Sequence, residues 1–185
     1  MLIEADFLNE SELVELIMLV REYAAPPPPH NWPVGQCASL NMNFTHLRRP
    51  WVQAIEKRIA DLIGRANNYA EELRGVWYRP GEGYRLHHDA FYPEAADFGE
   101  LVRDGGNRTA TAMIYLNTIT QGGETFFPEL GLTIAPRAGM LIAWRNLCAD
   151  KSPNTKMLHA ANPARGVDKY IVTQWFRETR QHGQG

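Results

Sequence analysis

Residues 84–89 read Tyr84-Arg85-Leu86-His87-His88-Asp89, and the interpretation of the whole chain starts from this stretch. The pattern is typical of a short β-strand. Because successive side chains of a strand point to opposite faces, His87 and Asp89 share one face and His88 points away. An imidazole and a carboxylate aimed the same way are candidate metal ligands. A histidine beside an acid is also common on ordinary surfaces, so a third ligand must decide.

The best third candidate is His159, in the tripeptide Leu158-His159-Ala160. Two imidazoles and one carboxylate on one side of a metal form the facial arrangement found in non-haem Fe(II) oxygenases. The other histidines have no companion ligands at a useful spacing: His30, His46 and His182.

Composition bounds the class of protein. The 185 residues suit one domain, and the 44% hydrophobic and 22% charged shares are those of a soluble globular protein. The net charge is −2 and the basic residues are scattered. We therefore expect neither a nucleic-acid surface nor a membrane-binding patch.

The cysteines and the N-terminus suggest a compartment. Cys37 and Cys148 form no CxxC pair, and the chain starts with an acidic stretch unlike a signal peptide. The apolar segment 13–20 contains Glu15 and is too short to span a bilayer. These features predict an intracellular, cytoplasmic protein, with Cys148 as a small buried hydrophobe.

Two helices are predicted in residues 1–69, which we interpret as a helical support region. Asn9 and Glu12 form a capping-box pattern, followed by apolar residues at helical spacing. Pro26–Pro29 end this helix and act as a rigid connector, with a docking motif as the alternative. Residues 31–42 are expected to be irregular or an edge strand. Pro50 suits the first position of a second helix, whose apolar stripe packs in a core.

Residues 70–178 are predicted to form the core domain. Short apolar runs separated by Gly, Pro and Asn indicate strands. The expected strands cover residues 76–79, 84–89, 109–117, 132–135, 140–145, 157–160 and 168–177. The long stretch 92–107 is expected to be a mobile, functional loop. The fold class is mainly β with supporting helices (α+β), as a sandwich or barrel with the helices packed outside.

Lys169 begins a strand whose two faces are both largely apolar, which predicts a central strand buried on both sides. A lysine in such a place is costly unless an anion meets it. Either Lys169 reaches solvent at the strand's start, or a small anion such as a dicarboxylate co-substrate lies beside it.

Nine motifs occur in an order that resembles the prolyl 4-hydroxylase branch of the 2-oxoglutarate- and Fe(II)-dependent dioxygenases. They are Tyr78-Arg79-Pro80-Gly81, Tyr84-x-x-His87-x-Asp89, the run from Gly105 to Thr111, Tyr115-Leu116-Asn117, Gly122-Gly123-Glu124-Thr125, Phe127-Pro128, Pro136-x-x-Gly139, Leu158-His159 and Lys169-x5-Trp175. The resemblance covers about residues 70–178. It implies a double-stranded β-helix, a jelly-roll or cupin-like barrel with the N-terminal helices outside.

The resemblance also implies roles for individual residues. The Fe(II) ligands would be His87, Asp89 and His159. The residues that hold 2-oxoglutarate would be Lys169 on its distal carboxylate, with Tyr78, Thr125 and Tyr115. For Tyr115, a place as a core strand tyrosine is the alternative. The proline pocket would be shaped by Tyr84, Arg108 and Trp175, with the Arg108 guanidinium donating to a peptide carbonyl.

The implied activity is hydroxylation of proline in a peptide or protein. O2 is consumed, succinate and CO2 are released, and L-ascorbate (vitamin C) is the expected reductant. Two alternatives stay open: the same chemistry on free proline, lysine or another small molecule, and a metal-binding barrel without catalysis. The sequence does not indicate an oligomeric state.

Overall fold

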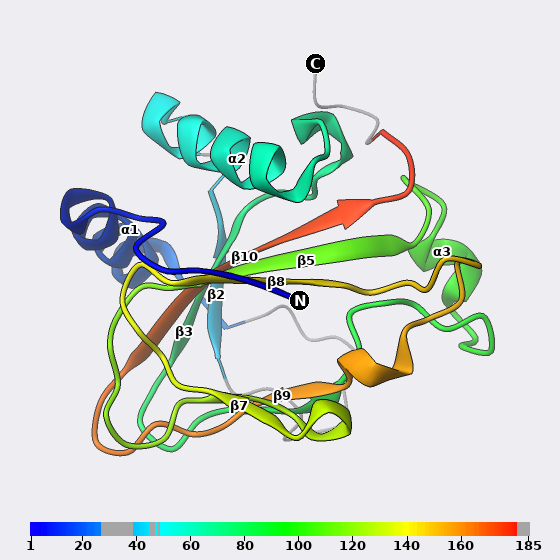
Figure 1. The fold of residues 1–185 in the computed structure, drawn as a ribbon. Coiled ribbons are helices and arrows are strands. Elements are labelled where there is room, and N and C mark those ends of the chain that lie inside the picture. Colours follow the sequence, from blue (N-terminus) through cyan, green and yellow to red (C-terminus); the bar gives the residue numbers. More distant parts are fainter. Residues whose placement is uncertain (27–38, 45–46, 48, 181–185) are drawn as a thin grey trace.

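The computed structural model describes residues 1–26, 39–44, 47 and 49–180. Two antiparallel sheets lie face to face, and helices α1 and α2 cover the outer face of the larger sheet (Figure 1). The prediction of a mainly β fold with helices outside is therefore confirmed.

The larger sheet has six strands in the order β1-β8-β5-β10-β3-β2. Their bounds are Leu2–Glu4 (β1), Leu141–Arg145 (β8), Arg108–Tyr115 (β5), Lys169–Arg177 (β10), Arg74–Tyr78 (β3) and Leu40–Asn43 (β2). The smaller sheet has four strands in the order β4-β9-β6-β7. Their bounds are Tyr84–His87 (β4), His159–Ala161 (β9), Thr125–Phe127 (β6) and Leu132–Ile134 (β7).

Strand β10 is central, as its sequence predicts, and it separates two hydrophobic cores. Tyr170, Val172 and Phe176 face the helices, while Ile171 faces the smaller sheet. Apolar residues on both faces of one strand thus hold the three layers together.

The helices form where their caps and apolar stripes predict. Helix α1 spans Glu10–Tyr23 and starts with the complete Asn9–Glu12 capping box. Helix α2 spans Pro50–Ile63 and ends at Gly64, whose φ of 72° suits glycine. Their buried faces pack on β3, β5 and β10 as part of one core. Of the helices in the described ranges, none is long and apolar enough to cross a membrane.

Several local expectations need correction. Strand β4 ends at His87, so Asp89 lies in a bend just beyond it. Strands β1 and β6 were not expected, because three-residue strands carry too little pattern to detect. Cys148 is exposed, not buried. The expectations for Pro27–Pro29 and for 31–38 fall outside the described residues.

The 92–107 segment is not a structureless loop. It contains the short helix α3, Phe98–Leu101, and both of its ends are tied to the fold. The Asn107 side chain pairs with the backbone N–H and carbonyl of Phe91. Arg177 Nη1 donates to the carbonyls of Leu101 and Gly106. The mobility of the segment between these anchors stays a prediction.

Helix α1 approaches β3 so closely at Gly75 that a side chain does not fit there. A Cβ on Gly75 would lie 2.6 Å from Val20 Cγ2 and 3.0 Å from Phe44. We expect Gly75→Ala to lower the free energy of unfolding by about 1–3 kcal/mol, through overpacking. Chemical denaturation measures this. Gly99→Ala is the control, because nothing lies within 4 Å of its Cβ position; equal stability of the two variants would contradict the tight contact.

Candidate metal centre

The structure brings His87, Asp89 and His159 together. Pairing of β4 with β9 sets His87 directly opposite His159, with ring centroids 4.2 Å apart. Asp89 reaches both rings from the bend after β4: His87 Nε2 lies 3.7 Å from Asp89 Oδ1, and His159 Nε2 lies 3.9 Å from Asp89 Oδ2. One ligand atom from each of the three lies within 4.8 Å of the others, a spacing that suits a single metal ion.

The tautomers of both histidines suit a metal. His87 Nδ1 lies 2.8 Å from the carbonyl of Arg85, and His159 Nδ1 lies 2.9 Å from the carbonyl of Met157. Because a carbonyl only accepts hydrogen bonds, each Nδ1 carries the proton and each Nε2 keeps its lone pair. Backbone contacts of this kind orient metal-binding imidazoles.

Electrostatics favours the protonation states that a cation needs. Burial, followed by the neighbouring His159, lowers the pKa of His87 to about 4, so this imidazole is neutral near pH 7. Burial alone would raise the pKa of Asp89. The two imidazoles, the Arg108 guanidinium and a hydrogen bond from Thr111 outweigh it, so the pKa is lowered and Asp89 is ionised. A neutral imidazole and a carboxylate are ready to bind a divalent metal.

Asp89 is held by a chain of hydrogen bonds that crosses between the sheets. Thr111 on β5 donates to Asp89 Oδ2 at 2.6 Å, and Asn146 Nδ2 donates to Thr111 Oγ1 at 2.9 Å. This bond fixes the orientation of the carboxylate, which keeps lone pairs for a metal. Sequence reasoning did not identify Thr111 or Asn146. Thr111 lies two and four residues before Met113 and Tyr115, so strand alternation alone would have placed it on the inner face.

His88 lies away from this cluster, as strand alternation predicts. Its Nε2 contacts the carbonyl of Thr155 at 3.1 Å and its ring packs against Tyr92.

Lys169 lies at the other end of the same interior. Its side chain is only 1% exposed, so the alternative of a solvent-exposed lysine is wrong. Within the described part of the chain its Nζ has no hydrogen-bond partner, and burial lowers its pKa to about 7 against a smaller opposing effect of Glu124. The rings of Tyr78 and Tyr115 lie 5.4 Å and 5.7 Å from Nζ. A buried ammonium with aromatic neighbours and no counterion is suited to an anionic ligand.

Tyr115 and Thr125 lie together beside this lysine. The Tyr115 hydroxyl lies 2.6 Å from Thr125 Oγ1 and 3.1 Å from the carbonyl of Ile134, and burial raises the pKa of the phenol. Tyr78 faces the same region, since it is the register partner of Lys169 on β3. The residues predicted to hold the co-substrate are thus brought together.

The predicted substrate residues lie near the metal end. The Tyr84 ring lies 3.9 Å from that of His87, and Trp175 lies opposite Thr111 in the β10–β5 register. The Arg108 guanidinium packs on the Trp175 ring. Its Nε and Nη2 already donate hydrogen bonds to the Glu71 carboxylate, at 2.7 Å and 2.8 Å. The Nη1 side of this guanidinium remains for a ligand, and its hydrogen bond to a peptide carbonyl stays a prediction.

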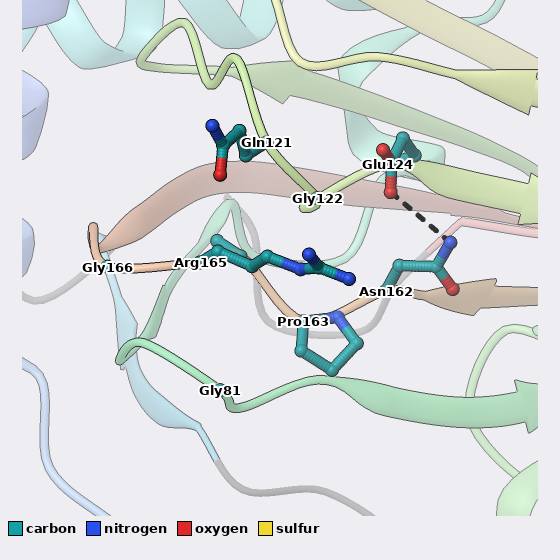
Figure 2. A pocket seen from close by; sticks show the side chains of 9 residues that line it. Gly81, Gln121, Gly122, Glu124, Asn162, Pro163, Arg165 and Gly166 are labelled. Atoms are coloured by element: carbon teal, nitrogen blue, oxygen red, sulfur yellow. Dashed lines mark hydrogen bonds between the residues drawn. The ribbon is translucent and has the colours of Figure 1, made fainter.

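An open hollow of about 880 Å³ lies among the loops that follow β3, β5 and β9 (Figure 2). Glu124, Asn162 and Arg165 are among the residues that line it. Its walls include none of the three clustered metal-binding candidates. The chemistry is therefore assigned to the barrel interior.

Comparison with known proteins settles the family. A sequence model of the 2OG-Fe(II) oxygenase superfamily matches residues 73–177, more than half of the chain. The chain belongs to this superfamily. Human prolyl 4-hydroxylase subunit alpha-1 is 36% identical over 133 residues, 71% of this chain and 24% of that protein. A mimivirus putative prolyl 4-hydroxylase (Acanthamoeba polyphaga mimivirus) is 31% identical over 132 residues, 71% of this chain and 54% of that protein.

Solved structures of the superfamily share the jelly-roll fold. The viral collagen prolyl hydroxylase of Paramecium bursaria Chlorella virus-1, in a 2OG complex, superposes with a TM-score of 0.76 at 23% identity. That alignment covers 95% of this chain and 94% of the viral one. A Trichoplax adhaerens prolyl hydroxylase, in complex with a hypoxia-inducible-factor peptide, has a TM-score of 0.70 at 20% identity, covering 96% and 83%. The predicted barrel is thus confirmed. The chain spans about a quarter of the human relative's length.

Thr111 tests how the metal centre is held. Thr111→Val keeps the side-chain volume but removes the hydrogen bond to Asp89, so we expect Co(II) and Fe(II) affinity to fall about 10–100-fold. Thr111→Ser keeps the hydroxyl and should retain most of the affinity. Metal titration followed by Co(II) absorption measures both; equal affinity in the two variants would show that the bond is incidental.

We expect Lys169 to lower the stability of the ligand-free protein and to strengthen the binding of 2-oxoglutarate. Lys169→Met replaces the buried ammonium with an apolar chain of similar length. The free energy of unfolding of the ligand-free protein should therefore rise by about 1–3 kcal/mol. The same change should weaken 2-oxoglutarate binding by roughly 100-fold or more, because the ligand's carboxylate loses its counterion. Denaturation and calorimetric titration report the two effects. The surface variant Lys57→Met should leave both nearly unchanged; unaltered 2-oxoglutarate binding in Lys169→Met would remove this lysine from the pocket.

Proposed function

We propose that this protein is a 2-oxoglutarate- and Fe(II)-dependent dioxygenase that hydroxylates proline in a peptide or protein. The observation that carries the proposal is the content of the barrel: a His/Asp/His cluster at one end and the unpaired Lys169 ammonium at the other. A metal-binding barrel without catalysis would leave the buried Lys169 unexplained. The prolyl 4-hydroxylase relatives support proline as the target.

The residues fit both groups. His87, Asp89 and His159 would hold the metal, and three protein ligands leave coordination positions open for a chelating 2-oxo acid and O2. When bound, Fe(II) supplies the oxidative chemistry that converts 2-oxoglutarate and O2 to succinate and CO2 and places a hydroxyl on the substrate. Lys169 would pair with the distal carboxylate, beside the Tyr115 and Thr125 hydroxyls.

The protein's own contribution is orientation and exclusion of water. Tyr84 and Trp175 give flat aromatic walls near the metal end, which suit a pyrrolidine ring. The Glu71–Arg108 pair fixes one side of that wall. We also propose L-ascorbate as the reductant, and a cytoplasmic location on the basis of the chain's charge and cysteine pattern.

The two adjacent histidines give a direct test. We expect His87→Ala and Asp89→Ala to lower turnover by at least about 10³-fold, because each removes a metal ligand. His88→Ala should keep most of the activity, since its ring faces Thr155 and Tyr92. The assay supplies Fe(II), ascorbate, 2-oxoglutarate and a proline-rich peptide, and follows succinate by chromatography and a gain of about 16 Da by mass spectrometry.

Two outcomes separate the parts of the proposal. Succinate release without any modified peptide would keep the oxygenase and discard the peptide substrate. Equal loss of activity in all three variants would show that His88 also serves the metal site, which contradicts the assignment of His87 alone to the inner face of β4.

A further inference from the structure

A second cation, Arg74, faces the barrel interior near the metal end. In the sheet register Arg74 lies opposite Thr173, two residues along β10 from Ile171 and four from Lys169. Directly opposed residues share a face, so Arg74 is on the inner face with Lys169. Four residues of strand place the two positions about 13 Å apart.

One aromatic contact and the strand register place Arg74 close to the metal centre. Its guanidinium lies 4.8 Å from the centre of the Trp175 ring, and Trp175 is the register partner of Thr111, which binds Asp89. Tyr84, whose ring packs on His87, is also within electrostatic range of Arg74. Arg74 therefore lies in the same wall as the residues expected to shape the substrate pocket.

The charge of Arg74 is not neutralised by a direct ion pair. Among the described residues, no carboxylate lies within 4.0 Å of its guanidinium, and no hydrogen bond of its side chain is found. Glu71 and Glu72 favour its charged form from farther away, and Glu71 is already shared by Arg108 and Arg177, at 2.7 Å and 2.6 Å. Burial lowers the pKa of Arg74, and Arg108 adds repulsion, but an arginine keeps its charge in proteins. A partly buried guanidinium in this state is stabilised by an anion that arrives from outside.

The co-substrate does not account for Arg74. A 2-oxo diacid would direct its distal carboxylate to Lys169 and its other end to the metal, so neither carboxylate is left for a guanidinium at the Trp175 wall. The remaining ligand of the pocket is the substrate. Arginine presents a planar fork of donors that matches a carboxylate with two parallel hydrogen bonds.

We propose that Arg74 binds a carboxylate of the substrate next to the ring that is hydroxylated. The inference rests on the proposed function and deepens it, because it predicts an acidic substrate. The carboxylate has two possible sources: the α-carboxylate of a free or C-terminal proline, or the side chain of an acidic neighbour in a peptide.

Three matched pairs of probes distinguish these sources. They are L-proline against L-prolinamide, a peptide ending in proline as free acid against its amide, and an internal proline followed by Glu against the same peptide with Gln. For each pair we would measure kcat/KM from the 16 Da product. We would also measure affinity by calorimetry, with Mn(II) and an oxalyl analogue of 2-oxoglutarate, which does not turn over.

Wild-type protein should prefer the acid by about 10–100-fold in at least one pair, and the pair identifies the source. Arg74→Gln should abolish the preference in both kinetics and affinity, because it weakens the acid member of the pair about 10–100-fold more than the neutral member. Arg74→Lys should restore it in part, because it keeps the charge but not the fork. Arg79→Gln is the matched control: it makes the same charge change just beyond the same strand, where the side chain packs on Trp77.

The probes separate an error about Arg74 from an error about prolyl hydroxylation. Hydroxylation of acid and neutral probes at equal rates, or a preference that survives in Arg74→Gln, would overturn the role of Arg74 and leave the prolyl hydroxylase standing. Absence of hydroxylation on every probe, with succinate still formed, would overturn the prolyl assignment and this inference with it.

Discussion

The hydrogen bond between Thr111 and Asp89 joins the two sheets at the point where the chemistry is expected. The two histidines belong to the smaller sheet, where β4 and β9 set their rings side by side. Thr111 belongs to the larger sheet, and Asn146 holds it from the end of the neighbouring strand. The position of the carboxylate therefore depends on how the sheets are stacked. Stacking in turn depends on β10, whose two apolar faces pack on the helices and on the smaller sheet.

Charge inside the barrel is arranged at a cost to stability. Lys169 is almost completely buried with no hydrogen-bond partner, which raises the free energy of the ligand-free fold. The cost is understandable if an anion completes the site, because the same lack of a protein partner makes the ammonium available to a ligand. Tyr78 and Tyr115 supply ring faces that make the burial tolerable without neutralising it.

Much of this arrangement follows from the sequence, and the exceptions have physical reasons. Alternation along 84–89 and 169–177 correctly separates His87 from His88 and faces Lys169 inward. Helix starts at Asn9 and Pro50 follow from capping chemistry. Contacts between segments that are distant in the chain cannot be predicted from the sequence pattern. Nothing local in Glu71 indicates that it binds Arg108, and expecting β3 to begin at residue 76 excluded Arg74 from the inner face. Strands of three residues, such as β6, have too short a period to recognise.

The structure holds the metal-binding cluster and the wall around Trp175 by different means. The two histidines and Lys169 are fixed by strand register, and any shift of one residue would turn each to the wrong face. The wall around Trp175 is less constrained, because Arg74 and Arg108 contact its ring through long side chains. Arg177 links that wall to the 92–107 segment through the carbonyls of Leu101 and Gly106. If the proposed substrate pocket lies at this wall, a change of charge there would alter substrate preference without disturbing the register that positions the two histidines.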